Sequence, residues 1–321
     1  MKKDLLSITD LEREDIESLI SLSFDLKQMR QKKQDTHFSP LKGKTLAMIF
    51  HKASTRTRLS FEVGMFHLGG IAIYLNTHDL QMGRGESISD TARILSSYVD
   101  GILIRTYQQE EVEEMARWAR VPVINGLTNK HHPCQILSDL FTIKEKTGAL
   151  ESLKIAYIGD GNNIANSWLQ AAARLNLHLW VACPHGYEPD PEVVREVEAL
   201  QGPDKKRIVI SHDPQEAAYQ ADVLYTDVWV SMGQEEEKET RKKAFAGFQI
   251  NEALVQKARK NVLVMHCLPA YRGEEITPGV LDSKNSIIFQ QAENRLSMQQ
   301  AILLKLLGNT YAESTGKTDK Q

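Results

Sequence analysis

Short apolar runs alternate with amphipathic stretches along the first half of the chain. The run at 44–50 (KTLAMIF) has the length of a strand, and after it Leu59, Val63 and Phe66 recur at helical spacing until Gly69 stops the helix. The alternation then continues, with strands predicted at 44–50, 71–75, 101–104 and 121–125 and further helices at 89–99 and 111–120. This order of elements is typical of an α/β domain with a parallel sheet.

A second alternating series follows a predicted helix at 134–146. Its predicted strands lie at 153–158, 177–182, 207–210, 222–227 and 262–265, and its helices at 165–175 and 191–200. Two such series in succession predict two doubly wound, parallel-sheet α/β domains.

The domain boundary is expected at the break that Thr147 and the following glycine form. We therefore predict a first domain at 1–147 and a second domain at 148–291. A C-terminal helix at about 292–310 is expected to complete the first domain, and the polar tail at 311–321 is expected to be disordered.

Composition excludes several classes of protein. The 321 residues are 41% hydrophobic and 25% charged, and no apolar run approaches the ~20 residues that span a bilayer. A net charge of -3 provides no basic field for nucleic acid. The N-terminus does not read as a signal peptide, and the odd set of Cys134, Cys183 and Cys267 contains no C-x-x-C pair. We therefore expect a cytoplasmic protein that binds neither membrane nor nucleic acid.

The sequence STRTR at 54–58 concentrates anion-binding groups where a strand passes into a helix. Backbone N–H groups and the helix dipole favour a phosphate at such a place. The added hydroxyl and guanidinium groups belong to Ser54, Thr55, Arg56 and Thr57. In the alternative interpretation, Ser54 only caps the helix and Arg58 pairs with Glu62. Three hydroxyls beside arginines exceed what one cap needs, so the pattern favours an anion site.

The sequence HHPCQ at 131–135 opens the next helix. A histidine pair with Cys134 could ligate a metal, but no second ligand pair has suitable spacing. His132 and Gln135, three residues apart, can instead donate hydrogen bonds to a polarised carbonyl. A capping arrangement around Pro133 explains the same residues equally well.

The sequence GDGNNI at 159–164 stands where a dinucleotide fingerprint would stand. Ile164 replaces its third glycine, and the next strand ends without the acidic residue that binds a ribose. A nicotinamide dehydrogenase is therefore disfavoured. Asn162 and Asn163 offer amide groups for an amino-acid head group, or they form a tight turn.

Two further predicted strands end at side chains that could bind a substrate. Asp227 could receive an ammonium group, and Gly233 could let its loop close, although a surface loop before a charged run is the alternative. Cys267 follows a strand next to His266, where packing alone could explain the thiol.

Taken together, these motifs resemble the aspartate/ornithine carbamoyltransferase family. The matching strings are STRTRLSFE, HPCQ, HCLPAYRGEE and QQAENRLSMQQAIL, in order over nearly the whole chain. Within the family, DVWVSMG and HCLPA resemble the ornithine carbamoyltransferases, since aspartate members have HPLPR. The resemblance implies one domain for carbamoyl phosphate and one for L-ornithine, joined by two helices. It also implies citrulline and phosphate as products in arginine biosynthesis or catabolism, with no cofactor or metal.

The resemblance assigns roles to residues by their match to family motifs. The catalytic set is Arg105, His132 and Cys267. Carbamoyl phosphate would be bound by Ser54, Thr55, Arg56, Thr57, Gln81, Arg105, His132, Gln135, Cys267, Leu268 and Arg295. Ornithine would be bound by Asn163, Asp227, Ser231 and Met232. The family supplies the residue at Gln81 from a neighbouring subunit, which implies a homotrimer with shared active sites, and Ser297 stands where many relatives have histidine.

Two other readings compete with this one. The first is a carbamoyltransferase for putrescine, N-acetylornithine or aspartate, which would need a different second-substrate loop. The second is a metabolite-binding protein without catalysis on the same fold, because fold alone does not give function. That reading predicts losses at Arg56, His132 or Cys267, and all three are present.

Overall fold

The structure is a computed structural model that describes residues 1–32, 38–77, 80–201, 207–231, 233 and 235–308. The described residues form two compact units. The first comprises Met1–Leu6, Asp15–Gly126 and the chain from Leu296 onward, and the second comprises Ser7–Glu14 and Leu127–Arg295. The expected tail at 311–321 lies outside the described residues. The expected boundary after Thr147 stays a prediction.

The first unit is built on a sheet with the strand order β2-β1-β3-β4. Its strands are β1 (Thr45–Phe50), β2 (Ile71–Asn76), β3 (Gly101–Arg105) and β4 (Val123–Leu127). Its helices are α1 (Arg13–Gln31), α2 (Thr55–His67), the 3-10 helix η3 (Gln81–Arg84), α3 (Ile88–Tyr98), α4 (Gln109–Trp118) and the later part of α12 (Ile288–Leu307). β1 pairs in parallel with β2 on one side and β3 on the other. The chain therefore changes direction across the sheet between β1 and β3, where parallel sheets bind ligands.

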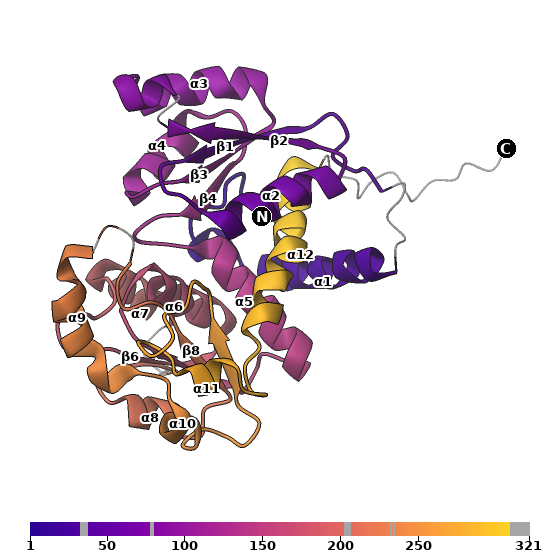
Figure 1. Cartoon of the computed structure of the whole chain (residues 1–321). Helices are drawn as coiled ribbons and strands as arrows, with labels where there is room; N and C mark the ends of the chain where they lie inside the picture. Colours follow the sequence, from indigo (N-terminus) through magenta and orange to yellow (C-terminus); the bar gives the residue numbers. More distant parts are fainter. Residues whose placement is uncertain (33–37, 78–79, 202–206, 232, 234, 309–321) are drawn as a thin grey trace. The chain divides into compact units, whose positions relative to one another are not determined.

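Helices cover both faces of this first sheet (Figure 1). Ile102 and Ile104 of β3 are buried in one apolar cluster with Val112 of α4. A side chain at Gly101 would point to the other face, where a Cβ would lie 2.6 Å from a Leu307 methyl of α12. Alternation along β3 thus separates the α3 and α4 layer from the α12 layer.

The second unit is built on a parallel sheet with the order β7-β6-β5-β8-β9. Its strands are β5 (Lys154–Ile158), β6 (His178–Ala182), β7 (Ile208–Ser211), β8 (Val223–Thr226) and β9 (Leu263–His266). Its helices are η1 (Ile8–Asp10), α5 (Pro133–Thr147), α6 (Asn163–Leu175), α7 (Pro191–Gln201), α8 (Pro214–Ala218), η4 (Glu235–Glu237), α9 (Lys238–Phe245), η5 (Ala246–Phe248), α10 (Glu252–Val255) and α11 (Pro278–Leu281). Its switch point lies between β5 and β8.

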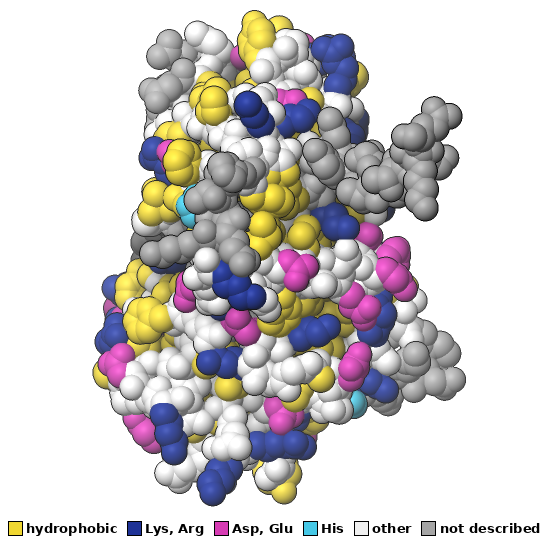
Figure 2. Space-filling view, turned by 90° about the vertical axis from the view of Figure 1, so that its right-hand side faces the viewer, with side chains coloured by type: hydrophobic (Ala, Val, Ile, Leu, Met, Phe, Trp, Pro, Cys, Tyr) yellow, Lys and Arg dark blue, Asp and Glu magenta, His cyan; other side chains and the backbone are white. Residues whose placement is uncertain are grey.

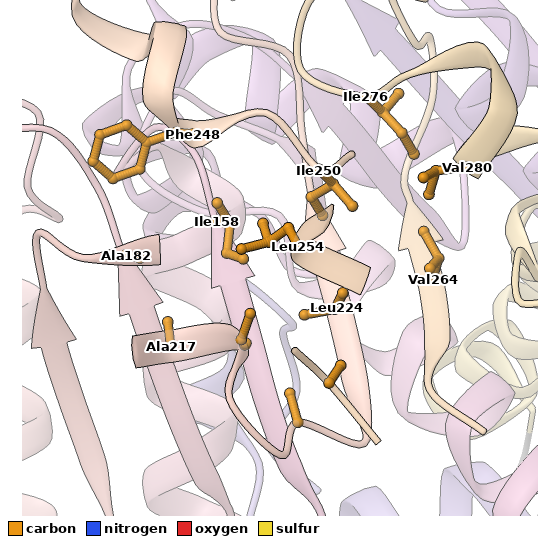
Figure 3. Close-up of a cluster of buried hydrophobic side chains, with 14 of the residues drawn as sticks. Ile158, Ala182, Ala217, Leu224, Phe248, Ile250, Leu254, Val264, Ile276 and Val280 are labelled. Atoms are coloured by element: carbon orange, nitrogen blue, oxygen red, sulfur yellow. The ribbon is translucent and has the colours of Figure 1, made fainter. Parts of the chain in front are cut away.

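An apolar core joins this second sheet to its helices. Figure 3 shows Ile158, Leu224 and Val264 from three neighbouring strands packed with Ala217 of α8 and Leu254 of α10. Helices α6 and α7 cover the opposite face (Figure 1). The structure confirms the predicted pair of parallel α/β sheets. No described helix is both long and apolar enough to cross a bilayer.

Candidate active site

The end of β1 brings the STRTR turn next to Arg105 in the first unit. Phe50 pairs with Arg105 in the register of β1 and β3, and the His51 N–H donates to the Arg105 carbonyl over 2.8 Å. Ser54 is the N-cap of α2, and its Oγ accepts from the Thr57 N–H at 3.2 Å. The N-terminus of α2 and the buried Arg105 therefore lie at the carboxyl ends of two neighbouring strands.

Both features of the alternative interpretation of this turn are present. The Ser54 cap is formed, and Arg58 Nε lies 3.3 Å from Glu62 Oε2 with its guanidinium over the ring of Tyr74. A serine hydroxyl that accepts one bond still has a hydrogen to donate, so the cap leaves the turn able to bind an anion. Arg56 is then the guanidinium of the turn.

Lysine 52 was not singled out from the sequence. Lys52 is buried, and its Nζ lies 4.1 Å from the centre of the Tyr107 ring, two residues before the Ser54 cap. A buried cation so close to the N-terminus of α2 adds to the positive potential there. The position of Lys52 in the strand-to-helix turn is the sequence feature that could have identified it as part of the site. Gln81 is exposed on η3 of the same unit.

The N-terminus of α5 positions His132 and Gln135 in the second unit. His132 is the buried N-cap residue with Pro133 after it, and its side chain makes no capping bond. Its backbone N–H donates to Ser167 Oγ at 2.8 Å. The capping arrangement around Pro133 is therefore present in the backbone, but the His132 imidazole does not form the cap.

Cys134 and His131 do not join His132 in a metal cluster among the described residues. Cys134 faces the core, where burial raises the pKa of its thiol to about 12. Burial, with a smaller contribution from the Lys130 charge, lowers the pKa of His131 to about 4, so that imidazole is neutral. His132 and Gln135 are buried polar side chains of the same segment, and their predicted role as hydrogen-bond donors stays a prediction.

A buried polar network holds Gln135 and Arg295. Arg295 Nη1 donates to Gln135 Oε1, and Gln135 Nε2 donates to Asp139 Oδ1 at 2.8 Å. Asp139 also accepts from Gln291 Nε2 and from the Tyr225 hydroxyl, each at 2.8 Å. Burial outweighs these donors and raises the pKa of Asp139 to about 6. The network fixes the Gln135 amide and the Arg295 guanidinium in one geometry.

The carboxyl ends of β8 and β9, which are neighbours in the second sheet, carry a carboxylate and a thiol. Asp227 follows β8 and Cys267 follows β9, and Cys267 Sγ lies 3.0 Å from Asp227 Oδ1. Burial and then the Asp227 charge raise the pKa of the Cys267 thiol, so it stays protonated and donates to the carboxylate. Asn162 Nδ2 donates to the other Asp227 oxygen at 2.9 Å. The site offers a negative charge framed by neutral polar groups.

The asparagine beside Asp227 is Asn162, whereas the sequence assignment named Asn163. Asn162 also caps α6 through its Oδ1, which accepts from the Ile164 N–H at 2.9 Å. Asn163 Nδ2 donates to the Thr128 carbonyl at 2.6 Å. The two amides therefore have separate partners, and a turn of the form NN gave no way to tell which one faces β8.

Leu268 has an unusual backbone that His266 supports. Leu268 has a φ of 61°, in the left-handed region that leucine rarely adopts. Its N–H donates to His266 Nδ1 at 2.9 Å, so His266 carries its hydrogen on Nε2, 3.0 Å from Glu275 Oε1. The buried pair of His266 and Glu275 thus holds the turn after Cys267.

The loop after Asp227 is anchored by a buried ion pair. Arg241 Nη1 of α9 lies 3.0 Å from Asp160 Oδ2 and donates to the Trp229 carbonyl at 3.0 Å. Burial raises the pKa of Asp160 to about 6 although Arg241 opposes the rise. Ser231 is half-buried in this loop, and the predicted Met232 lies outside the described residues.

Comparison with known proteins agrees with this architecture. Residues 3–145 match the family model "Aspartate/ornithine carbamoyltransferase, carbamoyl-P binding domain", and residues 151–306 match "Aspartate/ornithine carbamoyltransferase, Asp/Orn binding domain". The chain is 57% identical over 304 residues to the ornithine carbamoyltransferase of Syntrophus aciditrophicus, which covers 94% of this chain and 99% of that protein. It is 55% identical over 305 residues to that of Anoxybacillus flavithermus, covering 95% and 96%.

A solved structure shows the same fold. The ornithine carbamoyltransferase of Pyrococcus furiosus has a TM-score of 0.91 and 49% identity, covering 95% of this chain and 97% of that one. Because both domain models match in order and close relatives cover nearly the full length, the chain belongs to the aspartate/ornithine carbamoyltransferase family of enzymes.

Proposed function

We propose that the protein transfers the carbamoyl group of carbamoyl phosphate to the δ-amine of L-ornithine, giving L-citrulline and phosphate. The observation that carries the proposal is the pair of Asp227 and Cys267 at the carboxyl ends of β8 and β9, whose side chains approach within 3.0 Å. A carboxylate with a neutral thiol donor suits an amino-acid amine. The name of the relatives, ornithine carbamoyltransferase, supports the same acceptor.

In the first unit, the N-terminus of α2 would bind the phosphate group. The contributing side chains are Ser54, Thr55, Arg56 and Thr57. Backbone N–H groups at a helix start and a planar guanidinium both suit a dianionic phosphate. Arg105, at the end of β3, would stabilise the carbamoyl oxygen as it gains charge.

In the second unit, His132, Gln135 and Arg295 would act on the carbamoyl end. Attack of the amine gives a tetrahedral species whose oxygen carries developing negative charge. Preorganised hydrogen-bond donors stabilise this charged species more than they stabilise the bound substrate. The His132 imidazole is not engaged in capping, while Gln135 and Arg295 are already fixed by the Asp139 network. These donors need little rearrangement during reaction.

Asp227 would bind the ornithine amine and would not deprotonate it. An alkylamine has a reference pKa near ~10.4, and a neighbouring carboxylate favours its charged form. The raised pKa of Cys267 makes the thiol a donor and not a nucleophile or base. The departing phosphate is the proton acceptor in this scheme.

Phosphate release by the purified protein, together with citrulline formation when ornithine is the acceptor, tests the proposal. Carbamoyl phosphate is offered with L-ornithine, putrescine, N-acetylornithine or aspartate in parallel assays. Turnover with ornithine and none with the other acceptors is expected. Faster turnover with another acceptor would overturn the substrate assignment, and no turnover with any acceptor would favour the non-catalytic reading.

We also propose a cytoplasmic homotrimer in which Gln81 completes a neighbouring subunit's site. Exposed apolar side chains on α2 and β2 (Leu59, Phe66, Ile71 and Ile73) support an oligomer, because such a surface favours burial. Hydrophobic side chains also gather between charged ones on the face drawn in Figure 2. Light scattering measures the mass. Mixed oligomers of Q81A and R56A should regain activity that each variant alone lacks, and no regain would refute shared sites.

A further inference from the structure

The second unit carries two histidines and a glutamate close together on its surface. His185 and Glu188 lie in the connection between β6 and α7, and His212 lies just after β7. Their potential ligand atoms all lie within 4.8 Å of one another. None of the three residues belongs to the substrate-binding set proposed above.

The His212 ring is held in the tautomer that can ligate a metal. Its Nδ1 lies 2.8 Å from the Cys183 carbonyl oxygen. A carbonyl oxygen only accepts, so Nδ1 carries the hydrogen and Nε2 presents its lone pair. That Nε2 lies 3.8 Å from Glu188 Oε1. A backbone carbonyl on the other ring nitrogen is the usual orientation device of metal-binding histidines.

The other two groups lie close to His212. Glu188 supplies a carboxylate, the oxygen ligand of the group. The Gly186 N–H donates to both carboxylate oxygens, at 2.9 and 3.1 Å, which orients the group. His185 Nδ1 lies 4.0 Å from Glu188 Oε1, and the two imidazole centroids are 3.6 Å apart.

These distances fit a metal ion after a small adjustment. Tetrahedral bonds of about 2.1 Å place ligand atoms about 3.4 Å apart. The ligand atoms must therefore approach by about 1.4 Å or less, and His185, whose side chain is 83% exposed, has room to do so. Two imidazole nitrogens and one carboxylate oxygen suit Zn²⁺, Ni²⁺ or Cu²⁺, with water completing the coordination.

We propose that His185, Glu188 and His212 form a surface binding site for a divalent transition-metal ion of the Zn²⁺ class. The ion would join the connection after β6 to the connection after β7. The Gly161 N–H donates to the Tyr187 carbonyl at 2.9 Å, so the ion would sit on a loop that contacts the turn leading to Asn162.

A second group of potential ligands, Asp227, His266 and Cys267, is a weaker candidate. Both ring nitrogens of His266 are engaged, one accepting from Leu268 and one donating to Glu275. His266 therefore has no lone pair to offer. Cys267 and Asp227 could still hold Zn²⁺ weakly, so the experiment removes that thiol from every protein compared.

The test is isothermal titration of Zn²⁺ into tag-free, metal-stripped, full-length protein at pH 7.5. The parent carries C267S, and H212A and E188Q are added to it separately. H178A is the matched control, because His178 is an exposed histidine at the start of β6 and lies outside the cluster. Thermal melts establish that each variant is folded.

One Zn²⁺ per chain is expected in the parent and in H178A. H212A and E188Q should each weaken binding at least about 10-fold, since even residues that only orient ligands cost that much. Cu²⁺ bound to the parent should show electron paramagnetic resonance couplings to two imidazole nitrogens. Equal affinity in parent and H212A, or no binding tighter than on the order of 100 μM in the parent, would overturn the site.

Discussion

Replacing Asp139 with asparagine should change how stability depends on pH. The carboxyl of Asp139 has its pKa raised from 3.8 to about 6 in the folded protein, because burial penalises its charge more than its three donors compensate. At about 1.4 kcal/mol for a tenfold change in proton affinity, this rise corresponds to about 3 kcal/mol. The ionised carboxylate therefore destabilises the folded state at neutral pH by about that amount.

The sign follows from proton linkage. Between pH 4 and pH 6 the folded protein holds a proton on Asp139 that the unfolded chain has lost. The stability this proton provides is fully present below pH 4 and is lost as pH rises through 6. Asparagine cannot titrate but keeps an oxygen to accept from Gln135 and Gln291. Wild type should thus lose about 3 kcal/mol relative to D139N between pH 3 and pH 7.

Melting temperatures of both proteins across this range, at one protein concentration, measure the effect. For a domain of this size the difference in Tm should change by about 6 to 12 °C. D213N is the control, because Asp213 is an exposed cap of α8 that asparagine can replace. Parallel curves of melting temperature against pH for wild type and D139N would refute the assignment of a raised pKa to Asp139.

Three further substitutions probe the site. H132A should lower kcat by about 10²-fold or more with little change in the KM for ornithine, as expected for loss of an oxyanion donor. An unchanged kcat in steady-state assays would show that His132 does not have that role. G161A should raise the ornithine KM, because a Cβ at this position would lie 2.3 Å from backbone atoms. G247A is the control and should behave as wild type, because a Cβ there would have no heavy atom within 4 Å. Equal ornithine KM values for G161A and G247A would contradict the role of Gly161. R241M should lower the free energy of unfolding by about 3 to 5 kcal/mol, because it leaves the buried Asp160 carboxylate without its partner. R259M removes an exposed arginine from its pair with the half-buried Asp222 and should cost under about 1 kcal/mol. Similar losses in denaturant titrations would contradict a special contribution of the Arg241 pair.

The strands and the helix start at Ser54 were predictable because their signals are local. The apolar run before STRTR became β1, Thr45–Phe50, and Ser54 became a helix cap, since a short apolar run and a hydroxyl at a helix start each have one favoured structure. Parallel pairing then places β1 and β3 ends together, so Arg105 beside the turn also follows from the order of elements.

The polar interior of the second unit was not predictable in the same way. α12 begins at Ile288, earlier than the expected 292, because its first turns carry Gln290, Gln291 and Asn294, which hydrogen-bond to α5. Such residues read as solvent-facing or irregular in a sequence. Asp139 likewise reads as the polar face of an amphipathic helix, yet α5 is buried on nearly every side. Partners 86 to 152 residues away decide these burials, and no local pattern encodes them.

The division of the first unit along the chain has a consequence for biosynthesis. Its last segment begins at Leu296, after the whole second unit, and Gln300 and Leu303 of that segment lie against Gly64 of α2. A ribosome therefore releases the complete second unit before it releases the helix that closes the first. The first unit therefore lacks its last helix during most of synthesis. Until that helix is made, the α2 surface around Gly64 is uncovered, and this is the surface that a chaperone would bind.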